Sequence, residues 1–325
     1  MTRLVVILAI AAGCQSDPQA QSGALRVGFF PTVTHGAALV LLQRGELAHA
    51  IAPRAVEPHP FNAGPEAMEA LFAGAIDACY VGPMPALNAY LRSRGEALVI
   101  VAGAATGGAA LVVRKDSGIT GPEDLHGKKL SSPQLGNTQD LSLRAYLAAH
   151  GLTTNDRGGD VRVMPMAAPD LYSLLRRGDL DGAWVVEPWV SRLVDEAGAR
   201  ILVDEKELWP GGLYPTAVLV VTRKLLREHP ELVTQLVRAH VAAVAFIAGH
   251  RDQARELAAA ALVKYGKKQL PPQVMADAWQ RVRFDTALPP GALEKIAADA
   301  RQLGYLPKTG DVKAAVDLHF LEQLQ

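Results

Sequence analysis

Short apolar runs alternate with longer amphipathic segments along most of the chain, which is the pattern of strands and helices in turn. Up to residue 221 the expected strands are 25–30, 55–61, 78–81, 98–102, 109–113, 129–131, 161–164, 182–186, 201–203 and 216–221. The expected helices between them are 37–44, 65–73, one that ends at Ser93, 138–150, 169–177 and 188–197. The remainder is helical, over 224–228, 230–249, 251–265, 271–281, 291–304 and 310–324. Alternating strands and helices predict parallel βαβ units with helices on both faces of a sheet.

Two glycine-rich segments divide this series. They lie near 103–108 and 210–216, and they separate an outer part (25–105 plus 216–325) from an inserted part (106–215). The chain of 325 residues also exceeds the size at which one hydrophobic core usually stops growing. We therefore predict an α/β protein with two doubly wound lobes, a two-strand hinge at the glycine-rich segments, and a cleft between the lobes.

The N-terminus has the pattern of a bacterial lipoprotein signal. One positive charge, Arg3, precedes an unbroken apolar run from Leu4 to Ala12, and a cysteine follows at position 14. A membrane-spanning helix needs about 20 apolar residues, whereas a run this short suits a signal peptide. We expect a signal peptide over 1–13, a lipid on Cys14 and a flexible tether over 14–24. The protein would then be periplasmic or at the cell surface, anchored to a membrane. A hydrophobic N-terminus with an incidental cysteine is the alternative.

Composition narrows the function further. Lys+Arg and Asp+Glu both number 33, and this zero net charge provides no basic surface for nucleic acid. The most apolar later segment, 232–248, contains polar residues and is expected to be a buried helix, and Cys79 is expected to be a buried, inert thiol. The nine histidines have no metal-ligand spacing, and G-x-S-x-G, H-E-x-x-H, P-loop and C-x-x-C motifs do not occur. We therefore expect no catalysis, no metal and no cofactor.

Several motifs resemble, in order and spacing, those of the solute-binding proteins of ABC importers. They are Leu25–Pro31, Ala70–Asp77, Gly82–Ala86, Leu125–Lys129, Pro133–Asp140 and Trp184–Trp189. They are most similar to the nitrate, sulfonate and taurine branch, which is related to binders of thiamine-pyrimidine precursors, and the resemblance covers essentially the whole mature chain. It implies the class II periplasmic binding protein fold, a small anionic solute such as an aliphatic sulfonate, taurine or nitrate, an ABC permease as partner, and a monomer.

Loops that follow strands are the candidate binding segments, because ligands of open α/β sheets lie beyond the carboxyl ends of the strands. Thr34 and His35 follow the first strand and start a helix, whose free N–H groups attract anions. The alternatives are that Thr34 is only a helix cap and that His35 is only a solvated loop residue. Gly82, Pro83 and Met84 follow the third strand, and the resemblance places ligand there.

The second lobe contributes a matching set. Asn137 and Thr138 start a helix at the position where the resembling family grips its sulfonate or nitrate; the alternative is a plain capping turn. Glu187 either holds a ligand ammonium or hydroxyl group or caps the next helix, and Trp189 either walls the pocket or lies in the core. Two residues beside the crossings complete the set, Gly107 and Tyr214.

Three alternatives remain open. No lysine or arginine occurs in these loops, so an anion would rest on backbone donors and hydroxyls, while the apolar Phe30, Met84 and Trp189 suit a larger, partly apolar ligand. A second function is an enzyme of the same fold, of the menaquinone or thiamine-pyrimidine biosynthesis type, and a third is a sensor that docks on a membrane kinase. The enzyme predicts a chain without a signal, so the N-terminus favours the binding protein.

Overall fold

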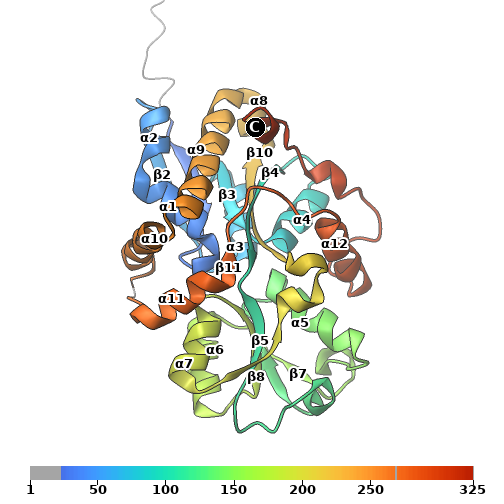
Figure 1. The fold of residues 1–325 in the computed structure, drawn as a ribbon. Coiled ribbons are helices and arrows are strands. Elements are labelled where there is room, and N and C mark those ends of the chain that lie inside the picture. Colours follow the sequence, from blue (N-terminus) through green and yellow to red (C-terminus); the bar gives the residue numbers. More distant parts are fainter. Residues whose placement is uncertain (1–22, 268, 325) are drawn as a thin grey trace, which may run out of the picture.

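The structure is a computed structural model that describes residues 23–267 and 269–324, so the expected signal peptide and Cys14 lie outside the described residues. It contains two sheets, each forming the centre of one lobe (Figure 1). The first has the order β11-β4-β10-β3-β1-β2 and the second the order β7-β6-β8-β5-β9. The strands of the first are β1 (Leu25–Phe29), β2 (Val56–Pro60), β3 (Ala78–Val81), β4 (Leu98–Gly107), β10 (Pro215–Thr222) and β11 (Val282–Arg283). Those of the second are β5 (Ala109–Val113), β6 (Lys129–Ser131), β7 (Arg162–Val163), β8 (Gly182–Val186) and β9 (Arg200–Asp204).

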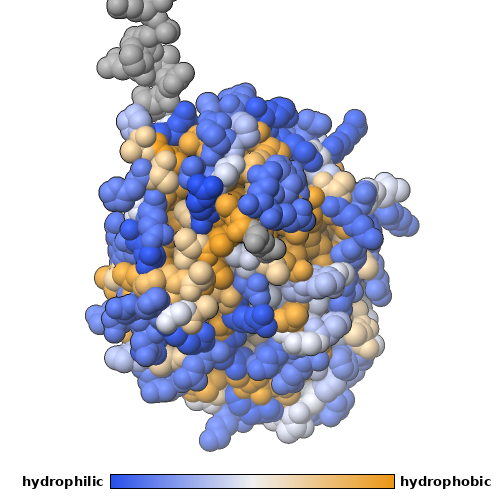
Figure 2. Space-filling view, turned by 45° about the horizontal axis from the view of Figure 1, so that its top comes forward, coloured by the Kyte–Doolittle hydropathy of each residue, from blue (hydrophilic) through white to orange (hydrophobic). Residues whose placement is uncertain are grey.

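Helices cover both faces of each sheet. The first lobe carries α1 (Gly36–Arg44), α2 (Glu46–Ala50), α3 (Gly64–Phe72), α4 (Pro83–Arg92), α8 (Arg223–Glu228), α9 (Pro230–Gly249), α10 (Arg251–Gly266), α11 (Pro272–Arg281), α12 (Ala292–Gln302) and α13 (His319–Glu322). The second carries α5 (Thr138–Ala149), α6 (Ala168–Arg177) and α7 (Trp189–Ala197). Four buried apolar clusters separate the helices from the sheets, one on each face. Hydrophilic side chains cover most of the face seen in Figure 2, and hydrophobic atoms gather toward its middle. The predicted α/β fold with two lobes is therefore confirmed.

The strands that cross between the lobes run against their neighbours. β1 is parallel to β2 and β3, and β6 is parallel to β7 and β8, as the βαβ pattern predicts. β10 is antiparallel to both β3 and β4, and β5 is antiparallel to both β8 and β9. The predicted parallel βαβ pairing therefore does not extend to these strands, because a strand that returns from the other lobe enters its sheet from the opposite end.

The first crossing is a two-glycine turn. Gly107 and Gly108 have φ angles of 75° and 72°, in the left-handed region that favours glycine, and they connect β4 directly to β5. The return crossing runs from β9 through two 3₁₀ turns, η5 (Glu205–Leu208) and η6 (Pro210–Gly212), into β10. The lobe boundaries predicted at 105/106 and 215/216 fall inside β4 and at the start of β10.

Two predicted elements differ from the structure. The strand expected over 98–102 continues to Gly107, and the helix expected over 310–324 is replaced by η7 (Lys313–Ala315) and the four-residue α13. In that segment the Asp311 carboxylate accepts from Lys313 N–H at 2.8 Å, and Asp317 accepts from His319 N–H at 3.2 Å. Aspartate side chains that bind nearby N–H groups in this way compete with helix formation.

Helix α9 is the one helix of the described chain that is long and apolar enough, by length and composition, to cross a membrane. Half of its most apolar window is buried, and α9 packs against α1 and α10 in the core of the first lobe. This agrees with the buried helix expected over 232–248. Cys79 is likewise buried, as expected, and burial raises the pKa of its thiol.

Candidate functional site

Gly82 and Thr138 meet across the boundary between the lobes. Gly82 precedes the first residue of α4 in the first lobe, and Thr138 is the first residue of α5 in the second. A Cβ atom on Gly82 would overlap the Thr138 hydroxyl oxygen. Thr138 is buried, and its Oγ1 has no hydrogen-bond partner among the described residues. A buried hydroxyl without a partner is uncommon, and it leaves one donor and acceptor available where the two lobes touch.

The first crossing brings Thr34 and Glu187 close to one another. A Cβ atom on Gly108 would lie 3.3 Å from Thr34 Cγ2 and 3.6 Å from Glu187 Cγ. The Glu187 N–H also donates to the Gly108 carbonyl at 2.8 Å. One residue from each lobe therefore packs on the same two-glycine turn.

Glu187 joins the two lobes through an ion pair. Its carboxylate accepts from the Ser191 N–H and hydroxyl, each at 3.0 Å, which caps the start of α7. Arg281, from α11 of the first lobe, places Nε 2.8 Å from Glu187 Oε1 and Nη2 2.9 Å from Asp204 Oδ2. Burial raises the pKa of Glu187 to about 7, although Ser191 and Arg281 oppose this rise. Of the two roles expected for Glu187, these contacts show the capping one.

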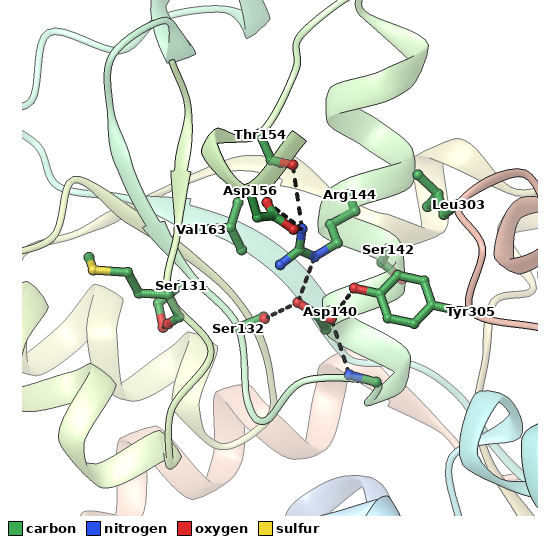
Figure 3. A network of polar contacts seen from close by, with 12 residues as sticks. Ser131, Ser132, Asp140, Ser142, Arg144, Thr154, Asp156, Val163, Leu303 and Tyr305 are labelled. Carbon is green, nitrogen blue, oxygen red and sulfur yellow. Dashed lines mark hydrogen bonds and ion pairs between the residues drawn. The ribbon is translucent and has the colours of Figure 1, made fainter. Parts of the chain in front are cut away.

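A second network centres on the buried carboxylate of Asp140 (Figure 3). It accepts from Ser132 Oγ at 2.8 Å, Gly136 N–H at 3.1 Å, Arg144 Nε at 3.2 Å and the Tyr305 hydroxyl at 2.9 Å. Tyr305 belongs to the first lobe, so this network also bridges the cleft. Burial and the neighbouring Asp140 raise the pKa of Tyr305.

The same network corrects the expected cap of α5. Asn137 is the N-cap residue, but neither its side chain nor that of Thr138 makes a capping hydrogen bond. Asp140, three residues after Asn137, instead binds the Gly136 N–H and orders the turn. A carboxylate placed in the first turn is also favoured by the helix dipole. The side chains of Asn137 and Thr138 are thus not used by the helix.

His35 is not the solvated loop residue that was one of its expected roles. It is buried, its Nδ1 accepts from the Phe30 N–H at 3.1 Å, and its ring stacks on Phe30 at 4.4 Å between centroids. Burial lowers its pKa to about 3, so the ring is neutral and holds the loop in shape. Thr34 makes no helix cap either; its hydroxyl lies 3.1 Å from that of Thr32.

Two of the apolar residues considered for a pocket wall lie in the core. Met84 and Phe30 are both buried in the apolar cluster that α4 and α12 cover. Pro83 is the first residue of α4 and is also buried. Trp189 does line the space between the lobes. The centre of its indole ring lies 4.8 Å from Arg192 Cζ and 6.0 Å from the centre of the Tyr172 ring.

Tyr214 and Gly107 connect the two crossings. The Gly107 N–H donates to the Tyr214 carbonyl at 2.8 Å. The buried Tyr214 hydroxyl lies 3.3 Å from Ser142 Oγ, which donates to Glu205. Trp184 Nε1 also donates to Glu205, at 2.7 Å, and burial raises the pKa of Glu205 to about 8. These contacts give both candidate residues structural partners at the hinge.

A pocket of about 900 Å³ lies between the lobes. Its first-lobe wall comes from the loops after β1 and β2 and from the end of α10, and its second-lobe wall from the segments that precede α5, α6 and α7. Arg144 and Arg192 line it, although no lysine or arginine occurs in the loops selected from the sequence. Both lie on helices beyond the loops that were considered. Arg192 could have been found because it lies three residues after Trp189, on the same helix face.

A second hollow of about 1000 Å³ lies along 206–213 and 280–285, on the hinge. Of the candidate residues, only Gly107 lines it. No group of three or more His, Cys, Asp or Glu residues that could hold a metal ion occurs within 23–267 and 269–324. Of the candidate residues, only Trp189 lines the pocket between the lobes, whereas Thr138 and Tyr214 line a separate hollow of about 260 Å³.

Comparison with known proteins defines the class. The sequence profile of the NMT1-like family matches residues 18–263, so the chain belongs to that family. Its fold is that of the periplasmic binding proteins: the alkanesulfonate-binding protein SsuA from Xanthomonas axonopodis pv. citri, solved with bound MOPS, superposes with a TM-score of 0.74 at 22% identity. That match covers 91% of this chain and 99% of SsuA.

Two relatives match in sequence. The taurine-binding periplasmic protein of Escherichia coli is 28% identical over 186 residues, or 57% of this chain and 55% of the relative. A putative aliphatic sulfonates-binding protein of Bacillus subtilis is 24% identical over 260 residues, or 78% of this chain and 75% of the relative. The chain thus spans about half the length of the taurine-binding relative.

Proposed function

We propose that this protein is an extracytoplasmic solute-binding protein of an ABC importer, which closes its lobes on a small anion of the sulfonate type and delivers it to a permease. The unpartnered hydroxyl of Thr138 carries this proposal, because it lies at the start of α5 and at the junction with Gly82 of the other lobe. A helix N-terminus with a free hydroxyl is a suitable site for a sulfonate oxygen. The names of the two relatives, for taurine and for aliphatic sulfonates, support it.

Three further parts belong to this proposal. The lobes rock about the crossings near 105 and 215, Thr34, Gly82, Asn137 and Glu187 lie at or beside the ligand, and the protein works as a monomer. Lipid at Cys14 anchors it to the membrane. Mass spectrometry of the membrane fraction tests the anchor: the wild-type N-terminal peptide should carry acyl mass, and Cys14→Ser should release the protein in soluble form.

Thermal unfolding of the purified protein against a panel of anions tests the binding function. The panel holds taurine, alkanesulfonates, nitrate, bicarbonate and phosphonates. A ligand at a hundredfold excess over its dissociation constant stabilises the folded state by about 2.7 kcal/mol, which is a clear shift of the midpoint. If no anion of the panel shifts the midpoint, the assignment is wrong.

Thr138→Val is the informative variant, because valine keeps the shape and removes the hydroxyl. Since Oγ1 has no partner in the structure, the variant should be as stable as the wild type and should bind the sulfonate more weakly by about tenfold, the worth of one hydrogen bond to a charged group. Thr234→Val, on the exposed side of α9, is the matched control and should bind normally. Normal binding by both variants would remove Thr138 from the site.

A further inference from the structure

The walls of the pocket between the lobes are largely apolar, and both lobes contribute to them. The volume of about 900 Å³ lies near the upper end of the range for sites that enclose drug-sized ligands. An apolar body that touches both walls would remove their surface from water and gain free energy in proportion to the area covered. The apolar side chains are Phe61, Leu262 and Leu270 from the first lobe, and Leu135, Met166 and Trp189 from the second.

The two basic side chains that line this pocket are already paired with carboxylates. Arg144 Nη1 binds Asp156 at 2.9 Å, and Arg192 binds Glu196 through Nε at 3.2 Å and Nη2 at 2.9 Å. The other charged residues that line the pocket are the carboxylates Glu66 and Asp156. An anion placed here would therefore meet at least as many carboxylates as guanidinium groups.

The protein itself uses backbone N–H groups at the helix starts that border this pocket. In the turn before α5 the Gly136 N–H binds the Asp140 carboxylate, and in the first turn of α7 the Ser191 N–H binds the Glu187 carboxylate. The second residue of α6 is Pro169, which has no N–H to donate. A charged group that left water for this pocket would lose hydration that these groups cannot replace, and such a loss is costly. The pocket therefore favours an uncharged ligand.

Arg144 gives the same pocket one polar point. Figure 3 shows a guanidinium nitrogen on the side of Val163 with no bond drawn to it, and both Arg144 and Val163 line the pocket. Because Asp140 and Asp156 already balance the charge of Arg144, this nitrogen supplies a hydrogen-bond donor without surplus positive charge. It suits an acceptor oxygen or ring nitrogen on an otherwise apolar ligand.

Trp189 provides a flat and well-supported surface. Its ring centre lies 4.8 Å from Arg192 Cζ, and the same guanidinium carbon lies 4.5 Å from the centre of the Tyr172 ring. Glu196 holds this stack together, since it binds Arg192 and also accepts from the Tyr172 hydroxyl at 2.7 Å. Phe61 supplies an aromatic ring from the other lobe. Aromatic side chains on both walls suit a flat ring system, because aromatic pairs gain energy beyond the area that they bury.

We infer that this pocket binds a flat, uncharged aromatic molecule that carries a hydrogen-bond acceptor, such as an aromatic amide, an aromatic ketone or a nitrogen heterocycle. Its body lies between Trp189 and Phe61, and its acceptor faces Arg144. The molecule is a second ligand beside the anion of the proposed function, because Thr138 lines a separate hollow of about 260 Å³. Each of the two ligands can therefore be tested without the other.

Isothermal titration calorimetry with 2-naphthamide, an uncharged ring system with an acceptor oxygen, tests this pocket. We expect saturable binding to the wild-type protein. Naphthalene-2-sulfonate and 2-naphthylmethylammonium keep the ring system and add a charge of either sign, so each should bind more weakly by more than about tenfold. Naphthalene lacks the acceptor and should bind about tenfold more weakly than 2-naphthamide, the worth of one hydrogen bond to a charged group.

Three variants locate the ligand. Leu135 is 60% exposed, so Leu135→Ser should fold normally, and it should weaken 2-naphthamide binding by roughly tenfold because it removes part of the apolar wall. Leu208→Ser is the matched control, since Leu208 is 41% exposed and lines a different cavity. Thr138→Val should bind 2-naphthamide as the wild type does, because Thr138 does not line this pocket.

The outcomes separate this second ligand from the proposed function. No binding of 2-naphthamide, or tighter binding of either charged probe, would overturn the uncharged ligand. Unchanged affinity in Leu135→Ser, or lost affinity in Thr138→Val, would place the ring system elsewhere and overturn the site. Methanesulfonate, which has no ring system, tests the proposed function alone: its failure to bind would leave the result for 2-naphthamide untouched.

Discussion

Glu187 is a buried carboxyl at the junction of the lobes, and replacing it with glutamine keeps its size while removing its ionisation. Two donors from Ser191 and the guanidinium of Arg281 contact it in the folded protein. Burial outweighs them and raises the pKa from 4.5 to about 7. Between these two values, the folded protein therefore holds a proton that the unfolded chain has released.

The sign and size of the effect follow from linkage. A raised pKa contributes stability that is complete below pH 4.5 and is lost as the pH rises through 7, and between pH 5 and pH 8 the loss is on the order of 2 to 3 kcal/mol. Other groups titrate in the same range. Glu205, with a pKa of about 8, acts in the same direction, whereas His35 and His240, lowered to about 3 and about 4, act in the opposite direction up to pH 6.5. They are present in both proteins, so the informative quantity is the difference between wild type and Glu187→Gln.

Urea unfolding from pH 5 to 8.5, followed by both tryptophan fluorescence and circular dichroism so that coincident transitions can be checked, measures this difference. The free energy of unfolding of the wild type, minus that of Glu187→Gln, should fall by roughly 2 to 3 kcal/mol between pH 5 and pH 8. Glu196→Gln is the control on the same helix: Arg192 lowers the pKa of Glu196, so its difference should stay constant over this range. A constant difference for Glu187→Gln as well would refute the reasoning, because Glu187 would then already be ionised at pH 5.

Two more substitutions test the contacts between the lobes. Gly82→Ala places a methyl group where it overlaps the buried Thr138 hydroxyl, at a backbone position, φ −64°, that alanine itself accepts. We expect the free energy of unfolding to fall by about 1–3 kcal/mol and sulfonate binding, measured by calorimetry, to weaken by about tenfold; unchanged stability and binding would show that the two residues do not meet. Tyr305→Phe removes the hydrogen bond to Asp140 and should lower the free energy of unfolding by about 1.5 kcal/mol, with weaker ligand binding; an unchanged value in urea unfolding would contradict the bridge.

Hydrophobic periodicity predicted the strands well because the central ones are buried on both faces. The runs 78–81 and 182–186 have the bounds of β3 and β8, and all but one of their residues are buried. The pattern failed over 310–324, whose apolar spacing resembles a helix. There, side-chain hydrogen bonds compete with the backbone hydrogen bonds of a helix, since Asp311 and Asp317 bind nearby backbone N–H groups.

From the sequence, the only site residues that could be predicted were those in loops that directly follow strands. The rule that ligands lie beyond the carboxyl ends of strands selected Gly82 and Thr138, and the structure brings them into contact. It could not select Arg281, which pairs with Glu187, or Tyr305, which binds Asp140 at a separation of 165 positions in sequence. Such pairs depend on how the two lobes pack against each other, and the hydrophobic pattern of the sequence does not predict that packing.

The contacts between the lobes explain why a ligand would control closure. The first lobe reaches the second through polar groups: Arg281 pairs with Glu187, and Tyr305 binds Asp140. Water replaces much of the energy of such pairs when the lobes separate, so they fix the geometry of closure more than they drive it. A ligand shifts this equilibrium only by its difference in affinity for the two states. A solute that touched Trp189 alone would bind the open and closed forms alike. A body wide enough to contact Trp189 and Phe61 together gains its second contact only on closure, and that difference would hold the lobes shut.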